Sequence, residues 1–271
     1  MKRLHSRHWV FLGLLVVITA AMLLRVPMQL RTSPETQRMF DYLDQLPEGS
    51  VILVSFDHEA SSLPEIRPIA EALLRHAFER DHKLIGMALL AEGTVIGYRL
   101  MEQVAEEYAR EYGEDYVYLG FKPQFIAAIL SMGESIPATF PEDYLGSPYA
   151  TLPLAQKVSS YDDVAGVLSI TDGSLTTHWI EYGGARYNLR VMAGVTAAMV
   201  TTYDPYVSSG QMHAMIGGLR GAAEYEQLID VGGGGLRGML AQSTAHLYIL
   251  LLVIIGNVLY WREKKNKAGK R

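Results

Sequence analysis

The chain has 271 residues, of which 49% are hydrophobic and 20% charged, and it contains no cysteine. The lack of cysteine excludes disulfides, thiolate metal sites, iron–sulfur clusters and cysteine nucleophiles. The net charge of −5 argues against nucleic-acid binding, which needs a basic footprint.

The chain begins with a predicted transmembrane segment at residues 9–28, in which Arg25 is the one charged side chain. About 20 apolar residues are needed to cross the hydrocarbon of a bilayer, and the long Arg25 side chain can reach the headgroups. Three lysine and arginine residues lie in segment 1–8, which is therefore predicted to be cytoplasmic. A cleaved signal peptide is the alternative, but apolar residues continue past Thr19–Ala21, where cleavage would occur.

Residues 29–49 are predicted to connect this segment to a domain. A short helix is expected after Ser33 and Pro34, which form a common N-cap and first-turn pair. The predicted domain covers residues 50–231, and five apolar runs within it have the composition of strands covered on both faces. These runs are residues 51–56, 84–90, 116–121, 164–170 and 191–200.

Helical patterns lie between the first strands, at residues 65–80, 95–112 and, in a shorter piece, 125–132. Strands that alternate with helices are typical of crossover units and of a mainly parallel sheet with helices on both faces. The sequence therefore predicts an α/β fold, a Rossmann-like or flavodoxin-like three-layer sandwich, flanked by N- and C-terminal transmembrane helices. Residues 136–163 contain four prolines and are predicted to form a long ordered loop, either functional or a plain insertion.

Glycines are frequent near the end of the domain. Gly217, Gly218 and Gly221 could be mistaken for a phosphate-binding loop, but they lie within a helix predicted over residues 211–229, and no Gly-Lys-Ser/Thr sequence follows. We expect these small residues to permit a close helix crossing. Segment 232–238 begins with four consecutive glycines and is predicted to be a flexible joint.

The second predicted transmembrane segment covers residues 239–261, and a basic tail at residues 262–271 follows it. Basic flanks stay inside, so this tail is predicted to be cytoplasmic as well. The whole chain has 24 lysine and arginine residues and 29 aspartate and glutamate residues. Nine of the basic residues and one of the acids lie in the two tails, so 15 basic and 28 acidic residues remain between the tails, a net charge of −13. This pattern predicts a protein of the cell inner or plasma membrane with a periplasmic or extracellular central domain.

Polar side chains follow the predicted strands, at the edge where open parallel sheets bind ligands. Strand ends are polar in any such fold, however, and Asp57 could simply cap a turn. A rim of this composition could suit a cation, an amine or a polyhydroxylated ligand. The candidate ligand rim consists of Asp57, His58, Glu92, Lys122, Asp172, Tyr203 and Asp204.

No motif predicts a metal, a cofactor or a catalytic mechanism. Consecutive residues of an extended strand point to opposite sides, so Asp57 and His58 would rarely share one metal ion. The sequence has no His-Glu-x-x-His spacing and no Gly-x-Ser-x-Gly elbow. We therefore predict no metal and no cofactor, and the catalytic residues, if there are any, stay unassigned.

The second transmembrane segment carries a polar stripe. Gln242, His246 and Asn257 are spaced four and eleven residues apart, which places them near one helical face. Polar side chains in hydrocarbon are costly without partners, so the stripe predicts contact with another helix. That helix could be the first span, a second copy of the chain or a different membrane protein. Gln242 and His246 could instead lie at the outer interface, where they need no partner.

Several stretches resemble a bacterial family of uncharacterised membrane proteins that has the same two-anchor layout. The stretches are SFDHEASSLPEIRPIAEALLRH, DYVYLGFK, YDPYVSSGQ, GGLRGAAEYEQL and AQSTAHL, with GN near the chain end. Together they cover most of residues 50–257. The resemblance implies two terminal spans with an extracytoplasmic α/β domain between them, and it brings no assigned activity.

Two functions are open at this point. The first is a membrane-anchored extracytoplasmic binding or interaction module that is part of a membrane complex; the double anchor, the polar stripe and the lack of catalytic spacings favour it. The alternative is a membrane-tethered hydrolase or transferase that uses the acidic rim. In both cases we expect an integral membrane protein that binds no nucleic acid and contacts either its own copies or another membrane protein through the second span.

Overall fold

The computed structural model describes residues 6–23 and 28–268, and the chain divides into two compact units. One unit, Gln29–Leu236, is the α/β domain. The other consists of Met1–Met28 and Arg237–Arg271. It contains helix α1 (Ser6–Leu23) and most of helix α11 (Gly234–Ala268).

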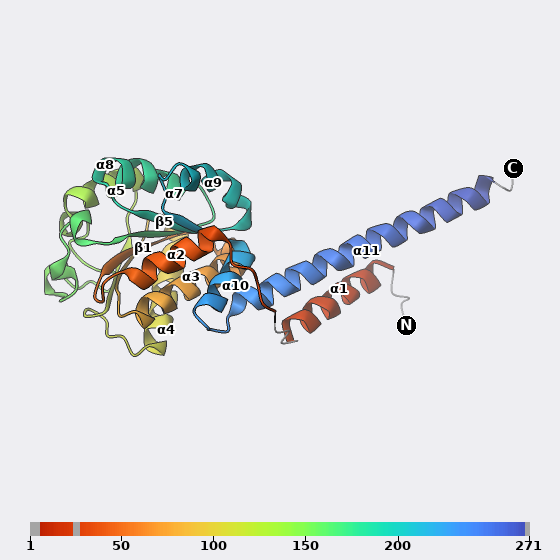
Figure 1. Ribbon diagram of the computed structural model, residues 1–271, viewed down its shortest axis with the longest axis horizontal. Coiled ribbons are helices and arrows are strands. Elements are labelled where there is room, and N and C mark those ends of the chain that lie inside the picture. Colours follow the sequence, from red (N-terminus) through yellow and green to blue (C-terminus); the bar gives the residue numbers. More distant parts are fainter. Residues whose placement is uncertain (1–5, 24–27, 269–271) are drawn as a thin grey trace. The chain divides into compact units, whose positions relative to one another are not determined.

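A six-stranded parallel sheet forms the centre of the domain (Figure 1). Its strand order is β3-β2-β1-β4-β5-β6. This is the Rossmann order and not the flavodoxin order, so the predicted α/β class and parallel sheet are confirmed and the flavodoxin-like alternative is wrong. The strands are β1 (Val51–Asp57), β2 (Lys83–Ala88), β3 (Tyr116–Phe121), β4 (Gly166–Thr171), β5 (Val191–Val195) and β6 (Ala214–Gly217).

Helices cover both faces of this sheet, which gives the three predicted layers. In Figure 1, α2, α3, α4 and α10 lie on one face, and α5, α7, α8 and α9 lie on the other. The helices of the domain are α2 (Pro34–Gln45), α3 (Leu63–Glu79), α4 (Ala91–Glu107), α5 (Phe125–Glu134), α6 (Ile136–Thr139), α7 (Leu175–His178), α8 (Ala185–Tyr187), α9 (Val200–Ser208) and α10 (Gly218–Leu228).

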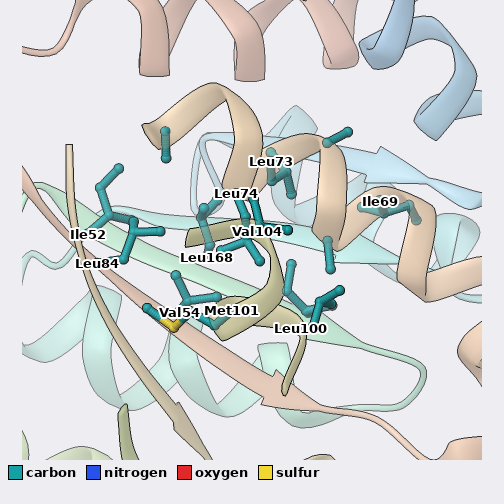
Figure 2. Close-up of a cluster of buried hydrophobic side chains, with 14 of the residues drawn as sticks. Ile52, Val54, Ile69, Leu73, Leu74, Leu84, Leu100, Met101, Val104 and Leu168 are labelled. Carbon is teal, nitrogen blue, oxygen red and sulfur yellow. The ribbon is translucent and has the colours of Figure 1, made fainter. Parts of the chain in front are cut away.

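The face under α3 and α4 holds a continuous apolar core (Figure 2). Side chains of a strand alternate between the two faces of a sheet. Ile52 and Val54 of β1 therefore point to the same side, where they meet Leu73 of α3 and Met101 and Val104 of α4. Burying a side chain of this size contributes about 2 kcal/mol relative to leaving it exposed, so this face is a principal source of the domain's stability.

The segment predicted as a connector contributes a helix to this core. As expected, the Ser33 side chain caps the helix by accepting a hydrogen bond from the Thr36 backbone N–H, and Pro34 is the first helical residue. Met39 and Leu43 of α2 are completely buried. The compact domain therefore includes residues that precede its first strand.

The opposite face is covered in part by residues 136–163, the segment predicted as a long ordered loop. It contains α6 and three short 3-10 turns. Tyr149 and Tyr161 are buried, and their hydroxyls donate to the backbone oxygens of Val158 and Ile129, respectively. The segment is therefore ordered, and its aromatic side chains belong to the second core.

The sequence predicts five strands, and β6 is the one that it misses. β6 and α10 both lie within residues 211–229, the range for which the sequence predicts a single helix. Four apolar residues that run directly into a helical pattern show no period of their own, so the pattern favours one helix. Gly217 and Gly218 consequently form a strand-to-helix turn instead of a helix crossing, and Gly218 has a φ of +62°, which glycine adopts readily.

The four glycines at residues 232–235 lie close to the domain at the start of α11. The backbone N–H groups of Gly235 and Leu236 donate to the Glu226 carboxylate at 2.8 and 3.2 Å. A Cβ on Gly235 would lie 2.7 Å from the Ala223 backbone nitrogen. Glycine at this position is therefore required by the close approach of two backbone segments.

Among the described residues, one helix is long and apolar enough to cross a membrane: Gly234–Arg262, within α11. The apolar helix Arg7–Leu23, within α1, is shorter than this criterion requires. Residues 24–27 of the predicted span 9–28 lie outside the described residues. The first of the two spans therefore stays a prediction, and the second has the length and composition that it needs.

Candidate functional site

The carboxyl ends of β1, β2 and β4 meet at the turn that joins β1 to α3. The Glu59 backbone N–H donates to the Asp172 carboxylate at 2.9 Å, and the Ala60 backbone N–H donates to the Glu92 carboxylate at 3.2 Å. These bonds bring together residues that lie far apart in the sequence. Four predicted rim residues gather at this turn: Asp57, His58, Glu92 and Asp172.

Asp57 is the central residue of the site and is only 1% exposed. One of its carboxylate oxygens accepts a hydrogen bond from the Leu89 backbone N–H at 2.7 Å, and the other accepts one from the Ser55 hydroxyl at 2.6 Å. The Trp179 indole N–H lies 3.5 Å from this second oxygen. Asp57 therefore ties the end of β1 to the turn before α4 and to the segment after α7.

Burial raises the pKa of Asp57 to about 6, because a carboxylate inside the protein loses its hydration. The hydrogen bonds from Ser55, Leu89 and Trp179 oppose this rise by stabilising the charged form. A group with this pKa has the proton affinity of a general acid or base near neutral pH. Its burial, however, keeps it from direct contact with a substrate.

His58 is fully buried at the start of the same turn. Its Nδ1 lies 3.3 Å from the Glu59 carbonyl oxygen, and its Nε2 has no hydrogen-bond partner within the described part of the chain. Burial lowers the pKa of His58, and the nearby Asp172 carboxylate partly opposes this shift. A pKa below the usual histidine value keeps the imidazole neutral at physiological pH.

Two aromatic residues of the site cannot be found from sequence spacing. Tyr118 of β3 is fully buried with a hydroxyl that has no partner in the described structure, and burial, with the Asp57 charge, raises its pKa. Trp179 is fully buried at the start of a π-helical segment, Trp179–Gly184, that follows α7. Both reach the neighbourhood of Asp57 only through the tertiary fold, and an isolated aromatic residue signals nothing more specific than core packing.

Lys122, at the end of β3, supports the segment after α5. Its ammonium group donates to the Thr139 carbonyl oxygen and lies 5.4 Å from the centre of the Phe140 ring. Lys122 is therefore bound to the edge of residues 136–163 and does not extend freely from the rim.

Tyr203 and Asp204 lie on helix α9 and not at a strand end. β5 ends at Val195, five residues before the predicted end of the strand, and α9 begins at Val200. Tyr203 is buried, and its hydroxyl donates to the Gly173 carbonyl oxygen at 2.6 Å, next to Asp172. Asp204 is exposed. Tyr203 thus supports the loop after β4, whereas Asp204 is not part of the group around Asp57.

The site lacks the features that the Rossmann fold uses for dinucleotides. A glycine-rich turn after β1 normally receives the pyrophosphate, whereas residues 57–62 contain no glycine. Within the described ranges, no three His, Cys, Asp or Glu side chains are grouped so that they could hold a metal ion. The three rim carboxylates all accept backbone N–H groups of neighbouring turns. Their clear role is to fix these turns to one another.

The polar residues predicted on the second span are exposed on α11: Gln242, His246 and Asn257. The Asn257 side-chain amide donates to the Val253 carbonyl oxygen of its own helix at 2.9 Å. The Tyr248 hydroxyl, on the opposite side of α11, donates to the Val10 carbonyl oxygen of α1 at 3.1 Å. The contact with α1 therefore leaves the polar stripe uncovered.

Comparisons of the chain with protein-family models, with curated proteins and with solved structures find no match in any of the three. Its function has to be argued from its own site, surfaces and charges.

Proposed function

We propose that the chain is a membrane-anchored interaction module whose α/β domain lies outside the cytoplasm and whose carboxy-terminal helix pairs with a second copy of the chain. The observation that carries the proposal is the exposed polar stripe on an apolar helix. Residues 234–262 have the length and composition of a span, and Gln242, His246 and Asn257 are exposed on one side of it. A stripe of this kind in hydrocarbon is satisfied by another helix.

Asn257 is the strongest element of this stripe. It lies among apolar side chains, with Ile254 and Val258 about half exposed. Its amide group bonds to Val253, while its carboxamide oxygen has no partner among the described residues. An asparagine both donates and accepts, and a twofold contact places identical residues together. A second copy of the chain is therefore the simplest partner that satisfies both groups.

The proposed orientation follows from charge. Exposed Arg262, Lys264 and Lys265 end the apolar segment, directly after Tyr260 and Trp261. Aromatic residues favour the membrane interface, and basic residues stay on the cytoplasmic side. The acidic domain at the other end of the helix is then extracytoplasmic, which is also the layout of the bacterial family that the sequence resembles.

A pair of reporter fusions tests the orientation. A reporter that is active only outside the cytoplasm should be active when inserted in the exposed turn at Leu145–Ser147, and inactive when fused after Arg271. Insertion in this turn avoids the buried tyrosines of the segment. The reverse pattern of activity would invert the proposed topology.

The pairing is tested by cross-linking or energy transfer between full-length chains in lipid nanodiscs of defined protein content. Asn257→Leu should weaken dimerisation about tenfold, since an interhelical hydrogen bond in a membrane contributes about 1–2 kcal/mol. The matched control is the double variant Asn257→Leu/Leu259→Asn, which restores the composition but moves the carboxamide about 200° around the helix. It should stay as weak as the single variant. A chain that is monomeric at every protein content would refute the pairing, and stable co-purification of that monomer with another membrane protein would assign the stripe to a different partner.

The alternative, a membrane-tethered hydrolase or transferase, needs a rim carboxylate that reaches a substrate. Asp57 is buried, and Asp172 and Glu92 are bonded to the adjacent turn, so these contacts favour the interaction module. If Asp172→Asn, in a folded protein, abolished a hydrolytic turnover of the full-length chain, the enzyme would become the better assignment.

A further inference from the structure

A pocket opens at the amino edge of the sheet, at the opposite end of the strands from the rim. It encloses about 350 Å³ beside the first residues of β5 and β6. This volume lies within the range of small-ligand sites. Its polar lining comes from Asn188, Arg190, Gln211 and His213. We call it the amino-edge pocket.

The sheet itself fixes the positions of the two basic residues. Arg190 immediately precedes β5, and its carbonyl oxygen accepts the Val167 backbone N–H at 2.9 Å. His213 immediately precedes β6, and its backbone N–H donates to the Val191 carbonyl oxygen at 2.9 Å. Arg190 and His213 are therefore held side by side at the ends of paired strands, and not on a mobile loop.

Tyr42 of α2 provides a platform for both side chains. Its ring centre lies 4.9 Å from the Arg190 guanidinium carbon and 4.8 Å from the centre of the His213 ring. Its hydroxyl donates to the Ala165 carbonyl oxygen at 2.6 Å, which fixes the ring. A guanidinium over an aromatic face is attracted by the ring and accepts no hydrogen from it, so its N–H groups stay available to an anion.

Arg190 has no carboxylate partner among the described residues, a property that it shares with Arg31, Arg99 and Arg186. Ion pairs join six other arginines to nearby acids: Arg38–Glu35, Arg67–Glu71, Arg75–Glu107, Arg80–Asp44, Arg110–Asp81 and Arg220–Glu224. Among the arginines without such a pair, Arg190 is the one that lines the pocket, where its exposed guanidinium keeps its positive charge available.

The charges that act on His213 have the same sign. Burial lowers the pKa of His213, and the two charged groups that lower it further are the guanidiniums of Arg190 and Arg38. The imidazole is therefore neutral at pH 7, and one of its ring nitrogens can still donate a hydrogen bond. A positive potential with several N–H donors is the setting that binds a phosphate group.

We propose that the amino-edge pocket binds the phosphate group of a small ligand, with Arg190 as its bidentate partner and with Asn188, Gln211 and His213 as further hydrogen-bond donors. This site lies on the α/β domain and uses no residue of α11. It is therefore independent of the proposed helix pairing, and either can fail without the other. The same phosphate chemistry occurs on a free metabolite and on a lipid headgroup.

The test is calorimetric titration of full-length protein in phosphatidylcholine nanodiscs with inorganic phosphate and with glycerol phosphate, at constant ionic strength. Saturable binding is expected for at least one of them. Arg190→Gln should weaken it about tenfold or more, since charge-assisted bidentate bonds are the strong ones. Arg190→Lys should give an intermediate loss, because it keeps the charge but not the fork. Unchanged melting temperatures will show that both variants are folded.

Arg186→Gln is the matched control. Arg186 is near in sequence and lies over the Tyr187 ring at 5.6 Å, but it does not line the pocket. This variant changes the net charge equally and should bind like the unsubstituted protein. If Arg186→Gln and Arg190→Gln weaken phosphate binding equally, the loss comes from the change in net charge and not from the pocket, and the proposal is overturned.

A second arm separates the two sources of phosphate. The unsubstituted protein in phosphatidylcholine nanodiscs is mixed with vesicles that contain or lack phosphatidylglycerol, or with soluble glycerol phosphate, and the protection of Arg190 from a guanidine-specific reagent is measured. Protection by the anionic vesicles alone would assign the site to a headgroup, and protection by soluble glycerol phosphate alone would assign it to a metabolite. Protection by neither, together with no saturable heat, would refute the site.

Discussion

Replacing Asp57 by Asn tests the centre of the rim through the pH dependence of unfolding. Asp57 is 1% exposed, and burial raises its pKa from 3.8 to about 6 in the folded protein. The folded state therefore binds a proton more tightly than the unfolded state. The stability that results is fully present below pH 3.8, decreases as the pH rises toward 6, and is lost above the folded-state pKa.

The magnitude follows from the two pKa values. A difference of about two units corresponds to about 3 kcal/mol, at about 1.4 kcal/mol per unit. In Asp57→Asn the side chain is neutral at every pH, its oxygen can accept the Leu89 N–H, and its amide can donate to the Ser55 hydroxyl. The Trp179 N–H loses its acceptor, at a cost of about 1 kcal/mol. The free energy of unfolding of the variant, relative to that of the unsubstituted protein, should therefore rise by about 3 kcal/mol between pH 4 and pH 7.

Urea unfolding of the full-length protein in detergent micelles, followed by tryptophan fluorescence at several pH values, measures this difference. Asp204→Asn, on the exposed surface of α9, is the matched control, and its stability should follow that of the unsubstituted protein. If the Asp57→Asn and unsubstituted curves are parallel over this pH range, the buried carboxyl group does not titrate there, and the reasoning about the site is wrong.

Three other substitutions test contacts around the same fold. Gly93→Ala places a Cβ 1.8 Å from the Phe56 carbonyl oxygen, so α4 must shift. Thermal unfolding should show that the free energy of unfolding falls by about 1–3 kcal/mol or more. Gly173→Ala is the control, because a Cβ there meets open space, and it should leave the melting temperature unchanged. Glu226→Ala leaves the N–H groups of Gly235 and Leu236 without their acceptor and should lower the free energy of unfolding in urea by about 1–3 kcal/mol; Glu226→Gln should lose less. His76→Gln should reduce the decrease in the free energy of unfolding that occurs as the pH falls below 6.5. Burial lowers the pKa of His76 to about 4, so its stabilising contribution is present above pH 6.5 and up to about 3 kcal/mol is lost as the pH falls toward 4. If urea unfolding shows the same decrease below pH 6.5 in the variant and in the unsubstituted protein, His76 is not the group that causes it.

The fold class could be predicted because most strands are continuous apolar runs with helical patterns between them. β3 occupies the predicted residues, 116–121, without a shift. β5 is shorter than predicted, because the apolar residues 197–200 continue the run beyond Val195 although they already form a 3-10 turn and the start of α9. An apolar run does not by itself distinguish a strand from a buried helix.

The start of α4 shows why the site itself could not be predicted. The sequence favours a helix from Val95, whereas α4 begins at Ala91, and its N-cap residue, Leu90, offers no side-chain cap. The turn before this helix is instead held by the Asp57 carboxylate, which accepts the Leu89 backbone N–H across 32 residues of sequence. A local capping signal is absent because the acceptor comes from another strand, so neither the helix start nor the structural role of Asp57 is visible without the fold.

The polar side chains at the two edges of the sheet differ in how many hydrogen bonds they already make within the protein. This difference determines at which edge a ligand can form new hydrogen bonds. Open α/β sheets usually bind ligands at the carboxyl edge. Here Asp57, Glu92 and Asp172 accept backbone hydrogen bonds at that edge, and a ligand that displaced them would leave donors unsatisfied, at about 1–3 kcal/mol each. At the amino edge, the Arg190 guanidinium lies over the Tyr42 ring and keeps its donors available. A phosphate group therefore gains bonds there without breaking any within the protein.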